Sequence, residues 1–324
     1  MIDFTPSAIA FQLGPITFPW YGIGYAVGLF LAAWVIMKEA KRRGFDPNLV
    51  PNGMIVVAVA AIIGGRLYHV IDQWALYRDD PLKIVLPPYS GLGAYGGLLT
   101  GIIALFLYTR WKRLEFWTWM DIAAPGVFVM QGVARWGNFF NQELYGPPTN
   151  LPWGIAIDCA HRVAEYACPP GSDPGATLGQ HFQPLFLYES ISGFLGAATL
   201  LWLARRFPKQ LRPGDIAMIF IIWYSLVRFS LEYMRAGYNW TFFGIPTAQV
   251  VSLLFVAFAI LVLVYRHRPG ARVVPLTGQD PADDEPLTGQ DPADDGPPGG
   301  DVARDEEPAG RIGADPGAVS SPPA

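Results

Sequence analysis

Charged residues, histidines and cysteines are scarce in this chain of 324 residues. Only 15% of the residues are charged and 52% are hydrophobic, which excludes an ordinary soluble domain. The sequence contains four histidines without metal-ligand spacing, and neither a nucleophile elbow nor a phosphate-binding Gly-Lys-Ser/Thr loop. We therefore expect a membrane protein that uses no metal or other cofactor.

Seven apolar segments are each about long enough to cross a bilayer, which takes roughly 20 apolar residues. They predict an all-α polytopic membrane protein with about seven transmembrane helices. The first segment lacks the basic start and the small-residue cleavage site of a signal peptide, so we expect it to remain as a span. The segments lie near residues 18–37, 54–71, 93–109, 119–137, 184–204, 214–233 and 247–265.

Basic residues gather in alternate loops, after the first, third, fifth and seventh spans. Cytoplasmic loops carry the excess of Lys and Arg. We therefore predict that the N-terminus and the loop 138–183 lie outside and that the C-terminus is cytoplasmic. Because the basic residues are distributed between apolar segments instead of forming one patch, nucleic acid is not an expected partner.

The end of the chain differs from the rest. Residues 269–324 hold twelve acidic residues against three arginines, a net charge of −9, and the segment PLTGQDPADD occurs twice, at 275–284 and 286–295. Such a composition cannot bury a core. We expect a transmembrane domain over 1–268 and a disordered acidic cytoplasmic tail over 269–324, which serves either as a solvated extension or as a docking segment.

The two cysteines, Cys159 and Cys168, lie in the predicted outer loop. Disulfides persist in an oxidising compartment, so the pair could staple the loop. The alternative is a nucleophilic cysteine with His161 as its base.

Ionisable side chains inside the predicted spans lie near the outer surface. Each costs about 2.5–3.5 kcal/mol on insertion and so marks a candidate site. Nearly all of them occur in the outer thirds of spans two, four and six. We expect the isolated Arg66 to reach the outer headgroups, whereas the others have polar neighbours.

Helical spacing places these others on two helix faces. The combined faces predict a cavity with surplus positive charge, which suits a phosphate group. One face holds Arg135, Asn138 and Gln142, if the helix continues that far, and the other holds Tyr224, Arg228, Glu232 and Arg235.

Two further segments are unusual. The segment 132–146 (GVARWGNFFNQELYG) interleaves polar and aromatic residues, as a helix does when it leaves the bilayer through the aromatic belt. The segment 91–101 (GLGAYGGLLTG) has five glycines, which let a helix or a lipid approach its backbone. Tyr95 in that segment requires a partner for its phenol.

Together these segments resemble the prolipoprotein diacylglyceryl transferase family over about residues 10–268. The pattern RxGNFxNxELxG is the most specific of six blocks that occur in order. The blocks are Trp20–Gly22, Gly64–Arg66, Gly96–Leu98, Arg135–Gly146, Gln183–Glu189 and Arg228–Arg235.

The resemblance implies a transferase of the bacterial cytoplasmic (inner) membrane whose active site, in domain 1–268, faces the outer leaflet. Such an enzyme transfers the diacylglyceryl group of phosphatidylglycerol to the lipobox cysteine of a preprolipoprotein signal peptide. A thioether forms and glycerol phosphate is released, which begins lipoprotein maturation.

The resemblance also implies which residues act. Arg135 and Arg228 are expected to contact the lipid phosphate. Asn138 and Glu143 would orient Arg135 and the glycerol hydroxyls. Glu232 would hold Arg228 or Arg235. The matched positions are Tyr21, Gly96, Arg135, Asn138, Glu143, Gly146, Tyr224, Arg228, Glu232 and Arg235, with Tyr21 and Tyr224 expected to hydrogen-bond the headgroup.

Tyr95 occupies a position where many family members carry a histidine that is often assigned the thiol proton. A phenol, whose ordinary pKa is about 10, is a poor base at neutral pH. Our hypothesis is that the cationic cavity lowers the pKa of the substrate cysteine, and that Glu143 or the departing phosphate takes the proton.

Two other functions remain open from the sequence alone. Intramembrane arginines also mark the anion pathways of transporters, although the sequence shows no pair of corresponding broken helices. A catalytically altered paralogue that binds anionic lipid would carry the same motifs.

Overall fold

The computed structural model describes residues 1–84, 91, 93–237 and 241–269. Within this part the chain forms seven α-helices, each over one of the predicted apolar segments, so the predicted helices are confirmed. They are α1 (Trp20–Arg42), α2 (Leu49–Asp72), α3 (Ala94–Trp111), α4 (Phe116–Phe140), α5 (Leu185–Arg206), α6 (Asp215–Glu232) and α7 (Thr247–Arg266). The predicted acidic tail lies outside the described residues.

Four of the described helices, α1, α2, α5 and α7, are long and apolar enough to cross a membrane. Many of their large apolar side chains are exposed, among them Phe30 of α1, Ile63 of α2 and Leu261 of α7. Exposed apolar surface along a long helix is expected where lipid replaces water as the solvent.

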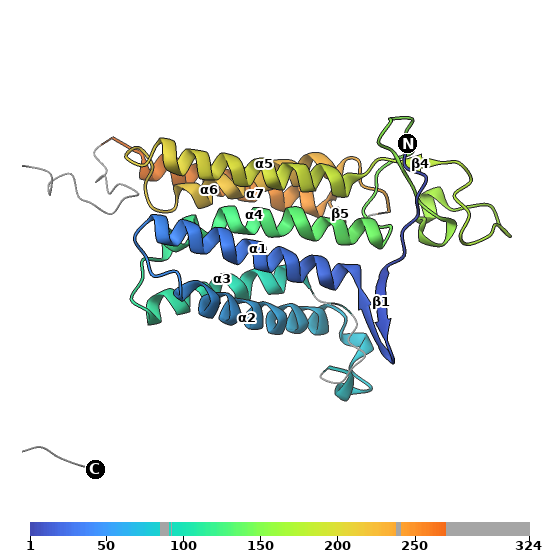
Figure 1. Cartoon of the computed structure of the whole chain (residues 1–324), viewed down its shortest axis with the longest axis horizontal. Helices are drawn as coiled ribbons and strands as arrows, with labels where there is room; N and C mark the ends of the chain where they lie inside the picture. The colour runs from blue at the N-terminus through green and yellow to red at the C-terminus, as the bar shows by residue number, and fades with distance from the viewer. Residues whose placement is uncertain (85–90, 92, 238–240, 270–324) are drawn as a thin grey trace, which may run out of the picture. The chain divides into compact units, whose positions relative to one another are not determined.

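Helix α4 is the centre of the helical arrangement. It packs against α1 and α5 and also contacts α6, while α2 pairs with α3 and α6 with α7; Figure 1 shows α4 running between α1 and α5. Small residues bring these helices close. A Cβ atom at Gly28 would lie 3.0 Å from the carbonyl oxygen of Met130, and one at Gly193 would lie 3.0 Å from that of Phe128.

The glycines of the segment 91–101 serve the pairing of α2 with α3. A Cβ atom at Gly96 would lie 2.3 Å from the carbonyl oxygen of Gly64. Any residue with a side chain at this position would therefore force α2 and α3 apart. One turn further on, the Thr100 hydroxyl donates to the carbonyl oxygen of Ala60 at 2.9 Å. Helix packing therefore accounts for Gly96.

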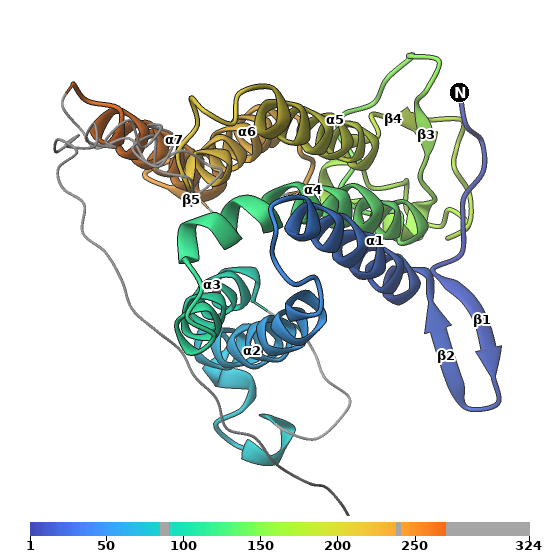
Figure 2. The ribbon, with the colours of Figure 1, turned by 60° about the vertical axis from the view of Figure 1, so that its left-hand side comes forward.

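Short strands and 3₁₀ helices, which the all-α prediction did not include, occur between the helices. The β1–β2 hairpin stands clear of the helices ahead of α1 (Figure 2). Antiparallel pairs are β1 (Ile9–Leu13) with β2 (Ile16–Pro19), β3 (Ile155–Ala156) with β4 (His181–Phe182), and β5 (Thr241–Phe242) with β6 (Ile245–Pro246). The 3₁₀ helices are η1 (Trp74–Leu76), η2 (Pro81–Ile84), η3 (Cys159–His161) and η4 (Ala164–Tyr166).

The connection between α4 and α5 folds into a small structured region with its own core. Tyr145, Ile157 and Phe182 are buried there against the first turn of α5. Cys159 and Cys168 form a disulfide. The predicted staple is therefore confirmed, and the alternative of a nucleophilic cysteine is wrong.

Candidate functional site

The C-terminal part of α4 carries Arg135, which points to a buried carboxylate. Its Nε contacts Oε2 of Glu189, near the start of α5, and Nη1 of Arg228 on α6 lies 3.8 Å from the other oxygen of Glu189. The Glu189 side chain is only 7% exposed. One carboxylate thus draws together arginines from two helices, as a buried charge requires a partner of opposite sign.

A second carboxylate extends this cluster. Glu232, whose side chain is 1% exposed, lies 2.6 Å from Nη2 of Arg228 and 3.9 Å from Nη1 of Arg235. Helix α6 ends at Glu232, so Arg235 reaches back from the turn that follows. The predicted grouping of Arg228, Glu232 and Arg235 is therefore present in the structure.

The cluster holds three guanidinium groups against two carboxylates and so carries one positive charge in excess. Within the described residues, Glu189 is the ion-pair partner of Arg135 and is contacted through Nε. The Arg135 side chain is 21% exposed, so its guanidinium group is partly open to an anion. Planar guanidinium donors that are fixed in place and partly open suit a bidentate phosphate.

Asn138 and Glu143 form a separate pair beside the cluster. Nδ2 of Asn138, which is buried, donates to Oε1 of Glu143 at 2.8 Å. Nδ2 of Asn141 donates to the same oxygen at 3.3 Å. Glu143 is exposed, whereas the carboxylate in contact with Arg135 is that of Glu189. The structure therefore brings Asn138 and Glu143 together but gives Arg135 a different partner.

The prediction that Gln142 continues the face of Arg135 and Asn138 is wrong. Helix α4 ends at Phe140, and Gln142 has a φ of +52°. This left-handed conformation, uncommon for a residue other than glycine, turns the side chain toward Asp158 in the connection between α4 and α5.

Two tyrosines lie near Arg135, and a third lies near one of these two. The phenols of Tyr21 on α1 and Tyr224 on α6 both interact electrostatically with Arg135. Tyr21 also interacts with Glu143, and Tyr224 with Tyr95 at the start of α3. The predicted tyrosines thus come together with the arginines from four different helices.

Gly146 completes the border of the site by close packing. A Cβ atom there would lie 2.9 Å from the carbonyl oxygen of Met234, and its N–H donates to the carbonyl oxygen of Gln183 at 2.8 Å. A larger residue would push the turn after α4 away from α5 and from the segment that carries Arg235.

Arg66 binds the segment that follows α2, and its expected reach toward the outer headgroups stays a prediction. Its Nη2 donates to the carbonyl oxygen of Lys83 at 2.7 Å and its Nε to that of Ile84 at 3.0 Å. The guanidinium also lies 5.1 Å from the ring centre of Tyr77. Arg66 therefore fixes the segment that follows α2, because buried or confined donors bind the nearest carbonyl oxygens.

Several buried carboxylates were missed by the sequence analysis, among them Glu189 and Asp121. Glu189 lies in a predicted span, next to Arg135, so the rule that nominated the arginines could have found it. Asp121, near the start of α4, is fully buried and accepts hydrogen bonds from the N–H groups of Gly214 and Ala217 at 2.7 and 2.8 Å. The expectation that nearly all ionisable side chains share one depth needs this correction.

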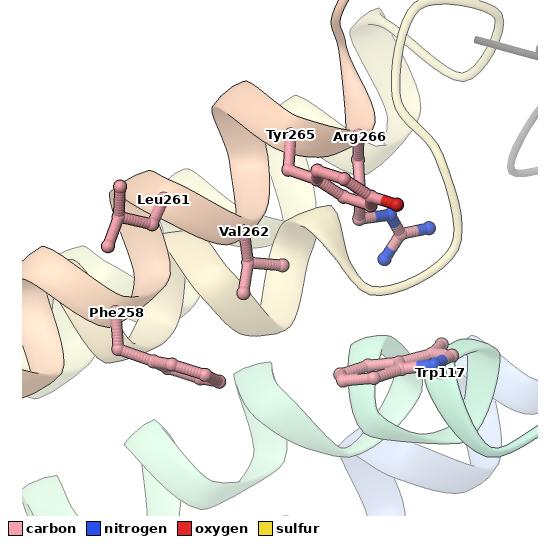
Figure 3. A pocket seen from close by; sticks show the side chains of 6 residues that line it. All are labelled: Trp117, Phe258, Leu261, Val262, Tyr265 and Arg266. Atoms are coloured by element: carbon pink, nitrogen blue, oxygen red, sulfur yellow. The ribbon is translucent and has the colours of Figure 1, made fainter.

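The groove in Figure 3 lies at the N-terminal end of α4, where Asp121 also lies. Its volume is about 410 Å³, and Trp117 of α4 faces Arg266 of α7 across it. Trp117 precedes Arg135 by eighteen residues, or roughly 27 Å along a helix. None of the predicted site residues lines this groove.

Comparisons with known proteins point to one family. The family model described as prolipoprotein diacylglyceryl transferase matches residues 8–265. A protein of Enterococcus faecalis named phosphatidylglycerol–prolipoprotein diacylglyceryl transferase is 39% identical over 267 residues, covering 82% of this chain and 93% of its own. Proteins with the same name from Chloroflexus aggregans and Halalkalibacterium halodurans are 36% and 35% identical, covering 82% and 80% of this chain and 92% and 86% of their own.

The resemblance is therefore confirmed over the whole helical part of the chain. With its apolar helices and these relatives, the protein is a bacterial membrane protein and a transferase. The chain belongs to the prolipoprotein diacylglyceryl transferase family.

Proposed function

We propose that this protein transfers the diacylglyceryl group of phosphatidylglycerol to the lipobox cysteine of preprolipoprotein signal peptides. The observation that carries the proposal is the pair Arg135 and Arg228, which share the buried Glu189 and stay about one-fifth exposed. The names of the relatives support the two substrates.

In this reaction the thiol sulfur attacks the glyceryl carbon that carries the phosphate. An S–C bond forms, the C–O bond to the phosphate breaks, and the thiol proton ends on the released glycerol phosphate. Negative charge grows on the departing phosphate, so cations fixed in advance near that oxygen lower the barrier most. Arg135 and Arg228 are such cations, because Glu189 holds both.

The remaining site residues take supporting roles. Glu232 holds Arg228 and Arg235, while Asn138 and Glu143, hydrogen-bonded to each other, bind the glycerol hydroxyls. Tyr21 and Tyr224 hydrogen-bond the headgroup. Gly96 and Gly146 allow the close packing that shapes the cavity.

The thiol proton does not need a histidine in this proposal. The excess positive charge favours the thiolate of the substrate cysteine, and Glu143 or the departing phosphate takes the proton. We expect Tyr95→Phe and Tyr95→His to turn over within about threefold of the wild type, since neither changes the arginine cluster. Loss of turnover in Tyr95→Phe with normal lipid binding would give the phenol a chemical role and overturn the hypothesis.

For the membrane arrangement we propose seven spans in the bacterial inner membrane, with the N-terminus outside and the C-terminus in the cytoplasm. Residues 1–268 form the catalytic domain and 269–324 an acidic cytoplasmic tail. The alternate basic loops support this orientation. The Cys159–Cys168 disulfide is consistent with an oxidising environment beside the end of α4 that carries Arg135, which supports an active site that faces the outer leaflet.

The decisive experiment uses purified protein, phosphatidylglycerol and a lipobox peptide, with mass spectrometry for a diacylglyceryl adduct on cysteine. We expect an adduct with the wild type and none above background with Arg135→Ala, with a Cys→Ser peptide as the substrate control. If folded wild-type protein binds phosphatidylglycerol but forms no adduct, the protein is a lipid-binding relative and the proposed activity is wrong.

A further inference from the structure

The turn that carries Glu143 is strained on both sides. Gln142 has a φ of +52° and Leu144 a φ of +56°, and both lie in the left-handed region that side chains disfavour. Such residues persist only where their surroundings hold them. The neighbours of this turn therefore determine where the Glu143 carboxylate lies.

Gln142 is held by a reciprocal pair of hydrogen bonds to Asp158. Its Nε2 donates to Oδ2 of Asp158 at 2.8 Å, and its Oε1 accepts from the N–H of Asp158 at 3.0 Å. Nε2 also lies 3.3 Å from the carbonyl oxygen of Pro6. The Gln142 side chain is buried, so each of its polar atoms requires these partners.

Tyr145, two residues after Glu143, is held by the same segment. Its hydroxyl donates to the carbonyl oxygen of His161 at 3.3 Å and accepts from the N–H of Val163 at 2.6 Å. Tyr145 is 2% exposed. The turn is thus attached on both sides of Glu143 to residues 158–163.

The disulfide closes that segment. Cys159 follows Asp158 directly and is bonded to Cys168. Oδ1 of Asp158 accepts from the N–H of His161 at 3.1 Å. Nε of Arg162 donates to the carbonyl oxygen of Ile157 at 3.1 Å. A covalent ring of few residues limits the conformations open to His161, which lies in the ring, and to Asp158, which is bonded to its first residue.

We propose that the disulfide-closed segment 158–168 positions Glu143 for catalysis, with Gln142 and Asp158 as its positioning residues. The inference rests on the proposed function, in which Glu143 acts on the glycerol moiety or the thiol proton. When either attachment is lost, the turn relaxes from its left-handed conformation and the carboxylate leaves Asn138. A displacement of this kind lowers the rate more than it lowers substrate affinity.

A charge-swap cycle tests the pair. Asp158→Asn leaves one acceptor oxygen where Nε2 of Gln142 and the N–H of His161 had two. Gln142→Glu turns a carboxylate toward Oδ2 of Asp158, so each single variant disturbs the pairing. The double variant restores it, because the carboxylate introduced on the turn then faces the amide introduced on the closed segment.

We expect about a tenfold loss of kcat in each single variant, with the KM for phosphatidylglycerol changed less than about twofold. The double variant should recover to within about threefold of the wild type. Ser172→Ala, in an exposed turn outside the ring, is the matched control and should keep wild-type kinetics. If the losses of kcat in the two single variants simply multiply in the double variant, the two residues do not act as a pair and the proposal is wrong.

Reduction tests the ring independently. TCEP reduces the disulfide to two thiols and is itself converted to the phosphine oxide, with oxygen and protons supplied by water. We expect TCEP to lower kcat by about three- to tenfold in the wild type. The Cys159→Ser/Cys168→Ser variant should start at that lower rate and not respond to TCEP. A wild type that keeps its rate after complete reduction would contradict the proposal.

Hydrogen exchange separates this proposal from the proposed function, because it needs no turnover. The amides of residues 142–146 should exchange at least about tenfold faster in the reduced protein, while those of α4 stay protected. If the wild type forms no adduct but this change occurs, the attachment is real and the assigned reaction is wrong. If the wild type is active and exchange at 142–146 is unchanged by reduction, the positioning role is wrong.

Discussion

The two ends of α4 each contain buried charge, yet they differ in what that charge can do. At one end Asp121 is fully buried, and its oxygens accept from two backbone N–H groups at the start of α6. At the other end Arg135 and Arg228 share Glu189 and stay about one-fifth exposed. The carboxylate oxygens of Asp121 are satisfied within the protein, whereas the guanidinium groups of Arg135 and Arg228 are partly open to a ligand.

The comparison shows that a buried ionisable residue is by itself no sign of a binding site. The first four N–H groups of a helix lack partners within the helix, and a carboxylate from another helix that satisfies two of them acts as a cap. Asp121 therefore ties α4 to α6, and it does so in a region where water cannot replace it. Surplus donors and partial exposure, as at Arg135, are the features that indicate a ligand.

The sharpest test of the difference between the two ends of α4 is to change Arg135 to lysine. Lysine keeps the positive charge but lacks the planar guanidinium group with its paired N–H donors. We expect the transfer rate to fall about 10²- to 10³-fold, or roughly 3–4 kcal/mol of transition-state stabilisation. Thermal unfolding in detergent should change little, since the ammonium still faces Glu189. A lysine variant at the wild-type rate would mean that point charge alone is enough and that the guanidinium geometry is unimportant.

Changing Asp121 to alanine should have the opposite result. Two N–H groups at the start of α6 lose a charged acceptor inside the protein, which costs about 3 kcal/mol of unfolding free energy. The rate per folded molecule should stay near that of the wild type. Asp121→Asn, which keeps one acceptor oxygen, is the matched control and should lose less stability. A loss of rate without a loss of stability in Asp121→Ala would place this residue in the catalytic machinery.

The sequence predicts the fold well because its signals are long. All seven helices follow from apolar segments of about 20 residues, which few other structures can use. The strands β3 and β4 contain two residues each, too few for an alternating pattern to be visible. The end of α4 at Phe140 was also missed, because the chain continues with residues that a helix tolerates until Gly146.

The sequence predicted the arginines of the site, but it did not predict Glu189, the buried carboxylate that Arg135 and Arg228 share. Arg135 and Arg228 were found because a lone arginine inside a span is costly. Their pairing through Glu189 depends on how α4, α5 and α6 pack, which one sequence does not reveal. Asp121 was missed for the same reason, since its partners are backbone N–H groups that any residue type supplies.

Changing Glu189 to glutamine tests what holds the arginines. The amide keeps the shape and one acceptor oxygen but loses the charge that both guanidinium groups share. We expect about a tenfold to hundredfold loss of transfer rate, smaller than for Arg135→Lys, because the cations remain while their positions loosen. Lipid binding should be retained or stronger, since the excess positive charge grows by one. Unchanged kinetics in Glu189→Gln would show that the arginines do not depend on this carboxylate.

The smallest expected effect concerns Asp158, whose carboxylate acts outside the membrane-spanning helices. Burial acts to raise its pKa, but hydrogen bonds from His161 and Gln142 outweigh burial and hold the pKa below its usual value. The carboxylate therefore stabilises the segment 158–163 at any pH above the ordinary aspartate pKa of about 4, and this contribution is lost as the pH falls through the lower folded-state value. Amide protection factors of residues 142–146 should fall in acid before those of α4 do. In Asp158→Asn the same amides should be less protected already at neutral pH and should lack this acid-dependent step; an identical step in that variant would assign the acid sensitivity to another group.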